Sequence, residues 1–211
     1  MPRVNPLPSP NTQGYHLFGW EVSPYTAKTR HYLRYKNIPF EDVHANAFAL
    51  KKNVVKKIGY LVMPVVHTPD GKVLQDSSVI LDALEEAPPN PPARQPSPVM
   101  AFADSLLEIF GDEWLPLTSL HFRWNNPTNR EFAYAEFGRN ALPYTPKFIQ
   151  KIFGKRIGAK MEGYLPALGI TPEMAEEIGP VFRDLLVHLE AILHESPYLL
   201  GSRPSYGDFA I

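Results

Sequence analysis

The stretch Ser23-Pro24-Tyr25-Thr26-Ala27-Lys28-Thr29-Arg30 decides how the first half of this chain folds. A serine followed by proline is typical of a helix start, because the serine side chain caps free N–H groups and proline fits the first helical position. The residues just before it, Tyr15-His16-Leu17-Phe18, have the pattern of a short strand. We therefore predict a strand followed by a helix over residues 24–36, with the Ser23 hydroxyl at the helix start.

Strand and helix patterns continue to alternate up to residue 86. Phe40-Glu41-Asp42-Val43 alternates like a strand, and residues 49–58 are compatible with a helix. Strands are expected at residues 64–67 and 72–74, on either side of the turn sequence Pro69-Asp70-Gly71. A helix over residues 77–86 completes the order β-α-β-α-β-β-α, which matches a thioredoxin-like fold.

Prolines mark the domain boundaries. The chain has 23 of them, and residues 1–13 are proline-rich and polar, which is typical of a flexible tail. A second cluster predicts a stiff, extended linker at residues 88–98, because proline fits neither helix nor sheet interiors. We expect an α/β thioredoxin-like domain at residues 14–87 and an all-α domain at residues 99–211.

The second half lacks strand patterns. Helices are expected at residues 100–115, 172–178 and 180–195, while residues 121–169 are rich in aromatics, glycine and proline and allow only a loose placement. Near the end, Ser205 and Asp208 have the spacing of a helix N-cap and its reciprocal acid. That helix would have only a few residues before Ile211, so we expect the natural chain to continue further.

Composition excludes several functions. The formal net charge of −1 gives no reason to expect nucleic acid or an anionic membrane as a partner. The sequence has no cysteine, so it has neither a disulfide framework nor a thiol of its own for redox or nucleophilic chemistry. The seven histidines have no metal-ligand spacing, and no metal is expected. The first residues have no apolar signal core, which favours a cytoplasmic location.

Two further motifs follow Ser23 along the chain. Met63-Pro64 precedes a predicted strand, where the proline could be cis, exposing the Met63 backbone to a ligand, or an ordinary trans proline at a strand start. Asp76-Ser77 opens a helix, where a hydroxyl and free N–H groups can bind a carboxylate or simply cap the helix.

Together, these three motifs resemble the glutathione-binding half of the glutathione transferase superfamily, in its serine-type form. The resemblance implies that Ser23 stabilises the thiolate of glutathione and that a cis Pro64 lets the Met63 backbone pair with the cysteinyl group. It also implies that Ser77 holds the γ-glutamyl carboxylate and Asp76 the γ-glutamyl amine. Many relatives have Glu or Gln in place of Asp76, whose side chain is shorter than either.

The resemblance further implies an activity. A glutathione transferase conjugates the thiolate of glutathione, its co-substrate, to a small electrophile, and such proteins are usually homodimers. One alternative is a non-catalytic relative that uses the fold for binding or assembly. A second is a glutathione-dependent isomerase or dehalogenase. A glutaredoxin-type disulfide reductase is disfavoured by the absence of cysteine.

Other residues have competing interpretations. Tyr15 and Tyr25 are alternative thiol activators, and Thr26 could assist Ser23 or only cap the helix. The glycyl carboxylate of glutathione needs a cation, for which the candidates are Lys51, Lys52 and Lys56. The segment 121–126 could line a substrate pocket or fill a helix corner, and the basic residues of 147–160 could form a membrane-surface helix or a solvated face.

Overall fold

The computed structural model describes residues 14–87 and 91–211. The described residues form two compact units: those up to Pro92 together with Arg139–Gln150, and Ala93–Gly138 together with Lys151–Ile211. The expected tail and part of the expected linker, residues 88–90, lie outside the described residues. The predicted domain boundary in the proline-rich segment stays a prediction.

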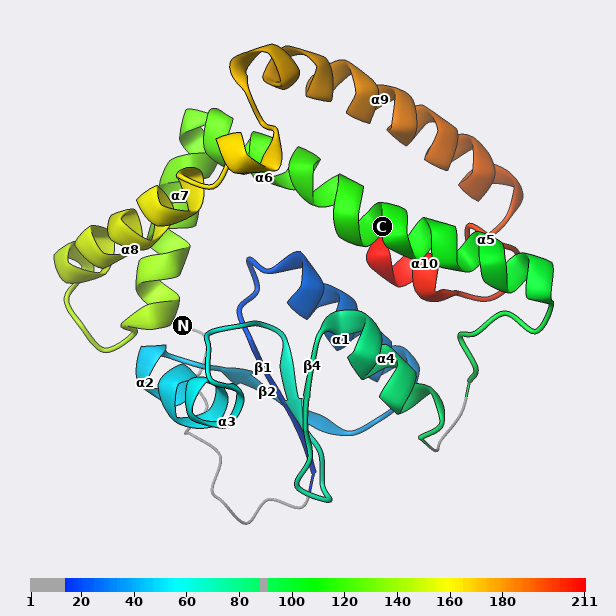
Figure 1. Cartoon of the computed structure of the whole chain (residues 1–211), viewed down its shortest axis with the longest axis horizontal. Helices are drawn as coiled ribbons and strands as arrows, with labels where there is room; N and C mark the ends of the chain where they lie inside the picture. Colours follow the sequence, from blue (N-terminus) through cyan, green and yellow to red (C-terminus); the bar gives the residue numbers. More distant parts are fainter. Residues whose placement is uncertain (1–13, 88–90) are drawn as a thin grey trace. The chain divides into compact units, whose positions relative to one another are not determined.

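The first unit contains a four-stranded mixed sheet in the order β2-β1-β3-β4 (Figure 1). Strand β1 (Tyr15–Gly19) runs parallel to β2 (Phe40–His44) and antiparallel to β3 (Val65–His67), which pairs antiparallel with β4 (Val73–Gln75). The predicted turn joins β3 to β4, with Gly71 at a φ of 85° that favours glycine. This topology confirms the thioredoxin-like fold.

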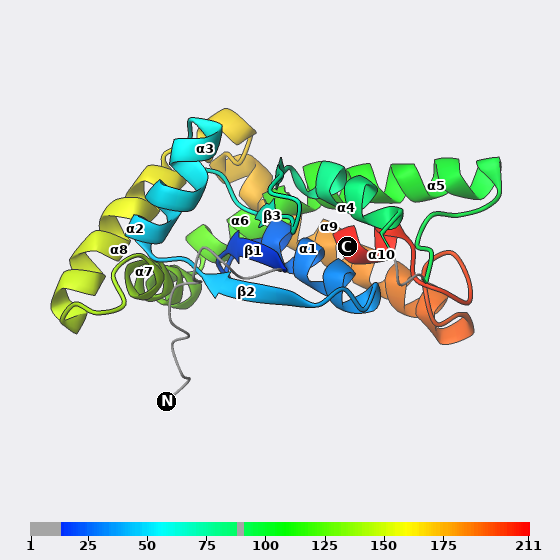
Figure 2. The same cartoon turned by 90° about the horizontal axis from the view of Figure 1, so that it is seen from below.

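Helices cover both faces of this sheet (Figures 1 and 2). Helices α1 (Pro24–Tyr35) and α4 (Ser77–Glu85) lie side by side on one face. On the other lie α2 (Ala47–Leu50), the π-helical turn η1 (Lys51–Val55) and α3 (Lys56–Ile58). Residues 49–58 are therefore helical as predicted, within an unbroken stretch over 47–58 that has a π turn in the middle.

The remaining structure is helical, as expected for an all-α second domain. Its elements are α5 (Pro98–Ile109), η2 (Phe110–Trp114), α6 (Leu115–Asn125), α7 (Pro127–Ala141), α8 (Lys147–Glu162), η3 (Pro166–Leu168), α9 (Pro172–Glu195) and α10 (Tyr206–Ala210).

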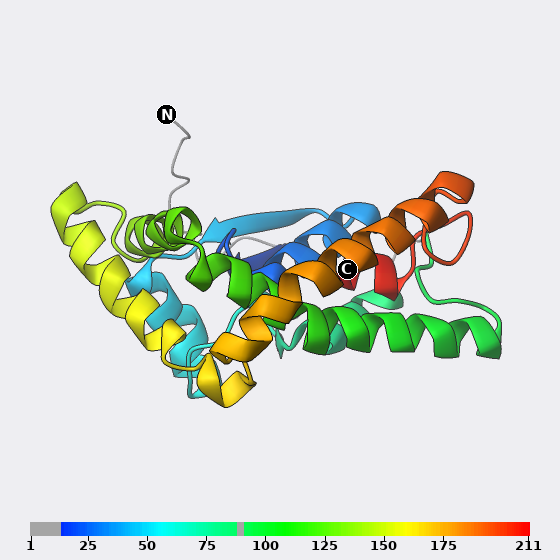
Figure 3. The same ribbon diagram turned by 90° about the horizontal axis from the view of Figure 1, so that it is seen from above.

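The prediction of two separate helices around Pro180 is wrong, because α9 runs through this proline without ending (Figure 3). Proline removes one helical N–H donor, and Pro180 is exposed, so water can satisfy the freed carbonyl of the preceding turn. The Phe182 ring on α9 packs against Phe122 on α6, with centroids 5.7 Å apart. Tertiary packing of this kind supports the helix beyond its proline.

The predicted cap at the start of α10 is confirmed. The backbone N–H of Ser205 donates to Asp208 Oδ2 at 2.8 Å. A second carboxylate assists, since Asp104 on α5 accepts from the N–H groups of Tyr206 at 3.2 Å and Gly207 at 2.8 Å. The three N–H groups of Ser205, Tyr206 and Gly207 are thus satisfied where this short helix begins.

Candidate functional site

Three chain segments meet at one edge of the sheet of the first unit. The register pairs Phe18 on β1 with Val65 on β3, and Val65 with Gln75 on β4. The C-terminal end of β1, the N-terminal end of β3 and the C-terminal end of β4 therefore lie together. Ser23, Met63 and Asp76 follow or precede these ends by only a few residues, so the fold gathers the three predicted motifs at one edge.

Ser23 occupies the N-cap of α1, as predicted. Its backbone is extended, with φ −93° and ψ 117°, and its Oγ accepts a hydrogen bond from the Thr26 N–H at 3.2 Å. The Ser23 N–H donates to the carbonyl of Trp20 at 3.0 Å, which fixes the preceding loop. Since the hydroxyl oxygen serves as acceptor in this cap, its own proton is left to donate to a ligand.

Neither Thr26 nor Tyr15 is placed to replace Ser23. Thr26 is fully buried and packs against Gly19, where an added Cβ would lie 2.4 Å from the threonine side chain. The Thr26 hydroxyl has no hydrogen-bond partner among the residues that the structure describes. Tyr15 begins β1 and therefore lies at the opposite edge of the sheet.

Met63 and Pro64 are joined by a cis peptide bond, as expected from the resemblance. Pro64 is buried, whereas Met63 is half-buried and precedes the first residue of β3. Within the described ranges, no backbone hydrogen bond involves the N–H or carbonyl of Met63. Both groups are therefore available to an extended peptide-like ligand.

Asp76 caps α4 in a left-handed backbone conformation, with φ 73° and ψ 126°. Such a backbone is uncommon for a residue other than glycine and is often found at ligand-binding sites. Its Oδ1 accepts from the N–H groups of Ser78 at 3.0 Å and Val79 at 3.2 Å. The carboxylate is otherwise exposed, so Oδ2 can accept from a ligand amine despite the short side chain.

Ser77 is the first residue of α4 and is only 6% exposed. Its hydroxyl takes part in none of the hydrogen bonds found among the described residues. The N–H groups of a first helical turn have no intrahelical acceptor and carry the positive end of the helix dipole. Ser77 therefore supplies donors suited to a carboxylate.

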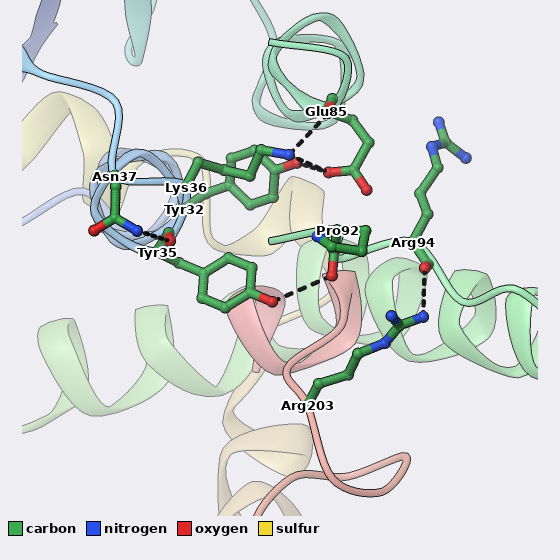
Figure 4. Close-up of polar contacts among 8 residues, drawn as sticks. All are labelled: Tyr32, Tyr35, Lys36, Asn37, Glu85, Pro92, Arg94 and Arg203. Atoms are coloured by element: carbon green, nitrogen blue, oxygen red, sulfur yellow. Dashed lines mark hydrogen bonds and ion pairs between the residues drawn. The ribbon is translucent and has the colours of Figure 1, made fainter. Parts of the chain in front are cut away.

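A ladder of polar contacts that was not predicted from the sequence joins α1 to α4. Lys28 Nζ donates to Ser78 Oγ at 3.3 Å near the start of both helices. At their far ends, Lys36 Nζ and the Tyr32 hydroxyl both donate to the Glu85 carboxylate (Figure 4). These contacts set α1 and α4 parallel, so their N-terminal ends lie on the same side.

The spacing of the ladder residues on α1 is visible in the sequence, but their burial is not. Lys28, Tyr32 and Lys36 are spaced by four residues, which places all three on one side of α1. Two lysines beside a tyrosine on a helix face are usually solvated, and only the structure reveals that both lysines are buried.

The three candidate lysines on the opposite face of the sheet, Lys51, Lys52 and Lys56, are exposed around the η1 turn. His67 on β3 anchors this turn, since its Nε2 donates to the carbonyl of Asn53 at 2.9 Å. Burial, assisted by the positive charge of Lys57, lowers the pKa of His67 to about 4. The ring is therefore neutral at physiological pH and acts as a fixed donor.

In the second unit, the segment 121–126 belongs to α6 and its end. Trp124 is buried against Tyr134 and Phe137 of α7, with ring centroids 6.0 and 5.9 Å away. His121 contacts the Phe122 ring and the Asn125 side chain. Trp124 thus fills a corner between α6 and α7, while Phe122, Asn125 and Asn126 are exposed. A role of this segment in a substrate pocket stays a prediction.

Comparison with known proteins agrees with this geometry. Residues 17–92 match the family model of the glutathione S-transferase N-terminal domain. The chain is also similar to a solved glutathione S-transferase from Rhodospirillum rubrum, with 16% identity, coverage of 93% of this chain and 74% of the other, and a TM-score of 0.61. The comparison with curated proteins finds no match.

Two further solved structures have the same fold. The beta-etherase LigF from a Sphingobium strain is 18% identical, with coverage of 93% and 80% and a TM-score of 0.62. A glutathione S-transferase from Methylobacillus flagellatus with glutathione bound is 19% identical, with coverage of 93% and 78% and a TM-score of 0.55.

Residues 17–92 therefore match a glutathione S-transferase N-terminal domain. The described chain has the fold of the solved glutathione S-transferases, a thioredoxin-like sheet followed by helices. In the part of the chain that the structure describes, no helix is both long and apolar enough to cross a membrane.

Proposed function

We propose that this protein is a serine-type glutathione transferase that conjugates glutathione to a small electrophile. The observation that carries the proposal is the convergence of Ser23, Met63 and the Asp76-Ser77 pair at one sheet edge. Each group has a donor or acceptor left over after its internal hydrogen bonds. Together these groups match the thiol, the peptide backbone and the γ-glutamyl end of one tripeptide.

In the proposed reaction, Ser23 donates a hydrogen bond to the sulfur of glutathione. A free thiol has a pKa near 8.5, so most of it is protonated and unreactive at neutral pH. The hydroxyl donor and the positive end of α1 both favour the thiolate. The thiolate attacks the electrophilic carbon and forms a C–S bond. In a substitution the leaving group departs from that carbon with its bonding electron pair, and in an addition the displaced electron pair stays on the substrate and takes a proton from water. Ser23 keeps its own proton throughout.

The rest of the ligand is held at fixed distances from that sulfur. We assign the Met63 backbone to the cysteinyl group, Ser77 to the γ-glutamyl carboxylate and Asp76 to the γ-glutamyl amine. One of Lys51, Lys52 and Lys56 is assigned to the glycyl carboxylate. A reduced glutathione pool is cytoplasmic, which agrees with the location expected from the sequence.

The first experiment is a calorimetric titration with glutathione. We expect saturable binding by the wild type and at least a tenfold loss of affinity in the Asp76→Ala, Ser77→Ala double variant. Thr68→Ala, on the β3–β4 turn, serves as a matched surface control that should bind normally. No binding by the folded wild type, even with glutathione in large excess, would contradict the proposal and favour a non-catalytic relative.

We further propose that two copies associate through α5. Its exposed side carries four apolar residues that are each more than half exposed: Val99, Phe102, Leu106 and Ile109. Their spacing of three and four residues forms a continuous stripe along the helix. Sedimentation should give a dimer for the wild type and a monomer for Phe102→Glu, and a wild-type monomer at all concentrations would contradict this assignment.

A further inference from the structure

Lys28 is a buried lysine beside the start of a helix. It is 3% exposed, and its Nζ lies 3.3 Å from the hydroxyl oxygen of Ser78, the second residue of α4. Ser78 in turn donates its N–H to Asp76 Oδ1 at 3.0 Å. The Lys28 ammonium is thus connected to the cap of α4 through a single residue.

This placement is electrostatically unusual. Cations are stabilised at the C-terminal ends of helices and are disfavoured at the N-terminal ends, where the helix dipole is positive. Lys28 adds a positive charge at the N-terminal end, in a buried setting where water screens it poorly. An anion that binds at this end of α4 therefore interacts favourably with both the dipole and the lysine.

A second observation also points to an anion here. Ser77, at the first position of the nine-residue α4, is only 6% exposed as a residue, and its hydroxyl is in none of the hydrogen bonds found among the described residues. Asp76, directly before it, has an exposed carboxylate. The site thus offers positive potential and donors beside one negative acceptor, which is complementary to a group that carries both a carboxylate and an ammonium.

We propose that Lys28 is a positioning residue that strengthens binding of the γ-glutamyl α-carboxylate at the start of α4. The inference rests on the proposed function, because it takes glutathione as the ligand. Lys28 acts through the field at the helix start and through its hydrogen bond to Ser78, which fixes the first turn of α4. It does not contact the sulfur and leaves the chemistry of Ser23 unchanged.

Two variants of Lys28 and one matched control test this role. Lys28→Met keeps the length of the side chain without the charge, and Lys28→Arg keeps the charge. The control is the Lys36→Met, Glu85→Gln double variant, which removes a buried lysine and its partner from the other end of the same ladder. All are titrated with glutathione and with a glutathione analogue whose γ-glutamyl α-carboxylate is an amide.

We expect Lys28→Met to weaken glutathione binding about tenfold, which corresponds to about 1.4 kcal/mol. Lys28→Arg should recover most of the loss, and the control should bind like the wild type. The amide analogue should bind the wild type and Lys28→Met equally. The bound thiol should keep the same pKa in every variant.

The outcomes separate the two proposals. If the wild type binds glutathione and Lys28→Met binds it equally well, the role of Lys28 is refuted and the proposed function stands. Equal losses of glutathione affinity in Lys28→Met and in the control would also refute the role of Lys28. The ladder would then affect binding only by holding α1 and α4 together. If the wild type binds no glutathione at all, the proposed function itself is refuted.

Discussion

Lys36 and Glu85 form a buried ion pair between the ends of α1 and α4. Lys36 Nζ lies 3.2 Å from Glu85 Oε2 and 2.8 Å from the Glu85 carbonyl oxygen, and the lysine is fully buried. The Tyr32 hydroxyl donates to the same carboxylate oxygen. This end of the ladder holds two helices whose other ends carry the candidate site.

Removing one partner of this pair should destabilise the protein strongly. Lys36→Met leaves the Glu85 carboxylate buried without its cation, so we expect the free energy of unfolding to fall by about 3–5 kcal/mol. In the Lys36→Met, Glu85→Gln double variant no buried charge is left over, and the loss should be much smaller. Urea denaturation of both variants measures the difference. A loss below about 1 kcal/mol in Lys36→Met would show that the pair contributes little.

The sheet and its flanking helices could be predicted because their signals are local. Ser23 and Pro24 mark a helix start and Gly71 a hairpin, whatever the rest of the chain does. The resemblance of the three motifs then placed Met63 and Asp76 near Ser23. The polar ladder could not be predicted, because a buried lysine such as Lys28 looks identical in sequence to a solvated one.

The middle helices, within residues 121–169, could be placed only loosely for a different reason. At Gly154 on α8, an added Cβ would lie 1.9 Å from the carbonyl oxygen of Tyr134 on α7, and at Gly158 it would lie 2.2 Å from the Tyr134 ring. These helices therefore approach through glycines rather than through a stripe of large apolar side chains. Helix prediction from apolar periodicity depends on such a stripe. It fails where helices pack closely through glycines, because glycine adds no apolar side chain to the pattern.

The stability of the protein should depend on pH through His67. Burial and the nearby charge of Lys57 lower the pKa of His67 to about 4, below the ordinary value of about 6.5. The unfolded chain therefore takes up a proton first as the pH falls. The contribution of neutral His67 to the stability of the folded protein is complete above about pH 6.5 and is lost as the pH falls towards 4.

This lowering of the His67 pKa would contribute about 3 kcal/mol to the free energy of unfolding if the ring were fully shielded from water. Since the His67 ring is only half-buried, we expect about 1–2 kcal/mol. His67→Gln keeps a donor for the Asn53 carbonyl but does not titrate, so the difference between its unfolding curve and that of the wild type isolates the effect. Parallel pH dependences from 7 to 4 would contradict the assignment.

Gly19 and Thr26 test how tightly α1 is packed on the sheet. Alanine at position 19 would bring its Cβ within 2.4 Å of the Thr26 side chain. We expect Gly19→Ala to lower the free energy of unfolding by about 1–3 kcal/mol, as overpacking in a core usually does. Thr26→Ala should cost less than most buried truncations, because the hydroxyl has no partner to lose.

Combining the two substitutions gives a sharper result. Trimming Thr26 to alanine removes the two atoms closest to the added methyl group, so the Gly19→Ala, Thr26→Ala variant should be more stable than Gly19→Ala alone. Thermal unfolding of the three variants measures this coupling. Strictly additive losses would mean that the two residues do not compete for space.

Ser23→Ala is the decisive substitution for the proposed chemistry, and its structural effect must be separated from its catalytic one. Loss of the cap on α1 should cost about 1 kcal/mol of stability, since the Thr26 N–H loses its acceptor. If Ser23 also donates to the glutathione sulfur, its removal should raise the pKa of the bound thiol by about 1–2, each pKa unit being worth about 1.4 kcal/mol.

The two effects have different pH signatures. A higher thiol pKa lowers turnover about 10- to 100-fold at neutral pH, and the deficit shrinks at high pH, where the thiolate forms without help. A lost cap alone gives a less stable protein whose pH–rate profile is unchanged. Profiles of kcat/KM, together with ultraviolet titration of the bound thiolate, distinguish them. A normal profile in Ser23→Ala would leave Ser23 as a cap only and make Tyr25, two residues further along α1, the next thiol activator to test.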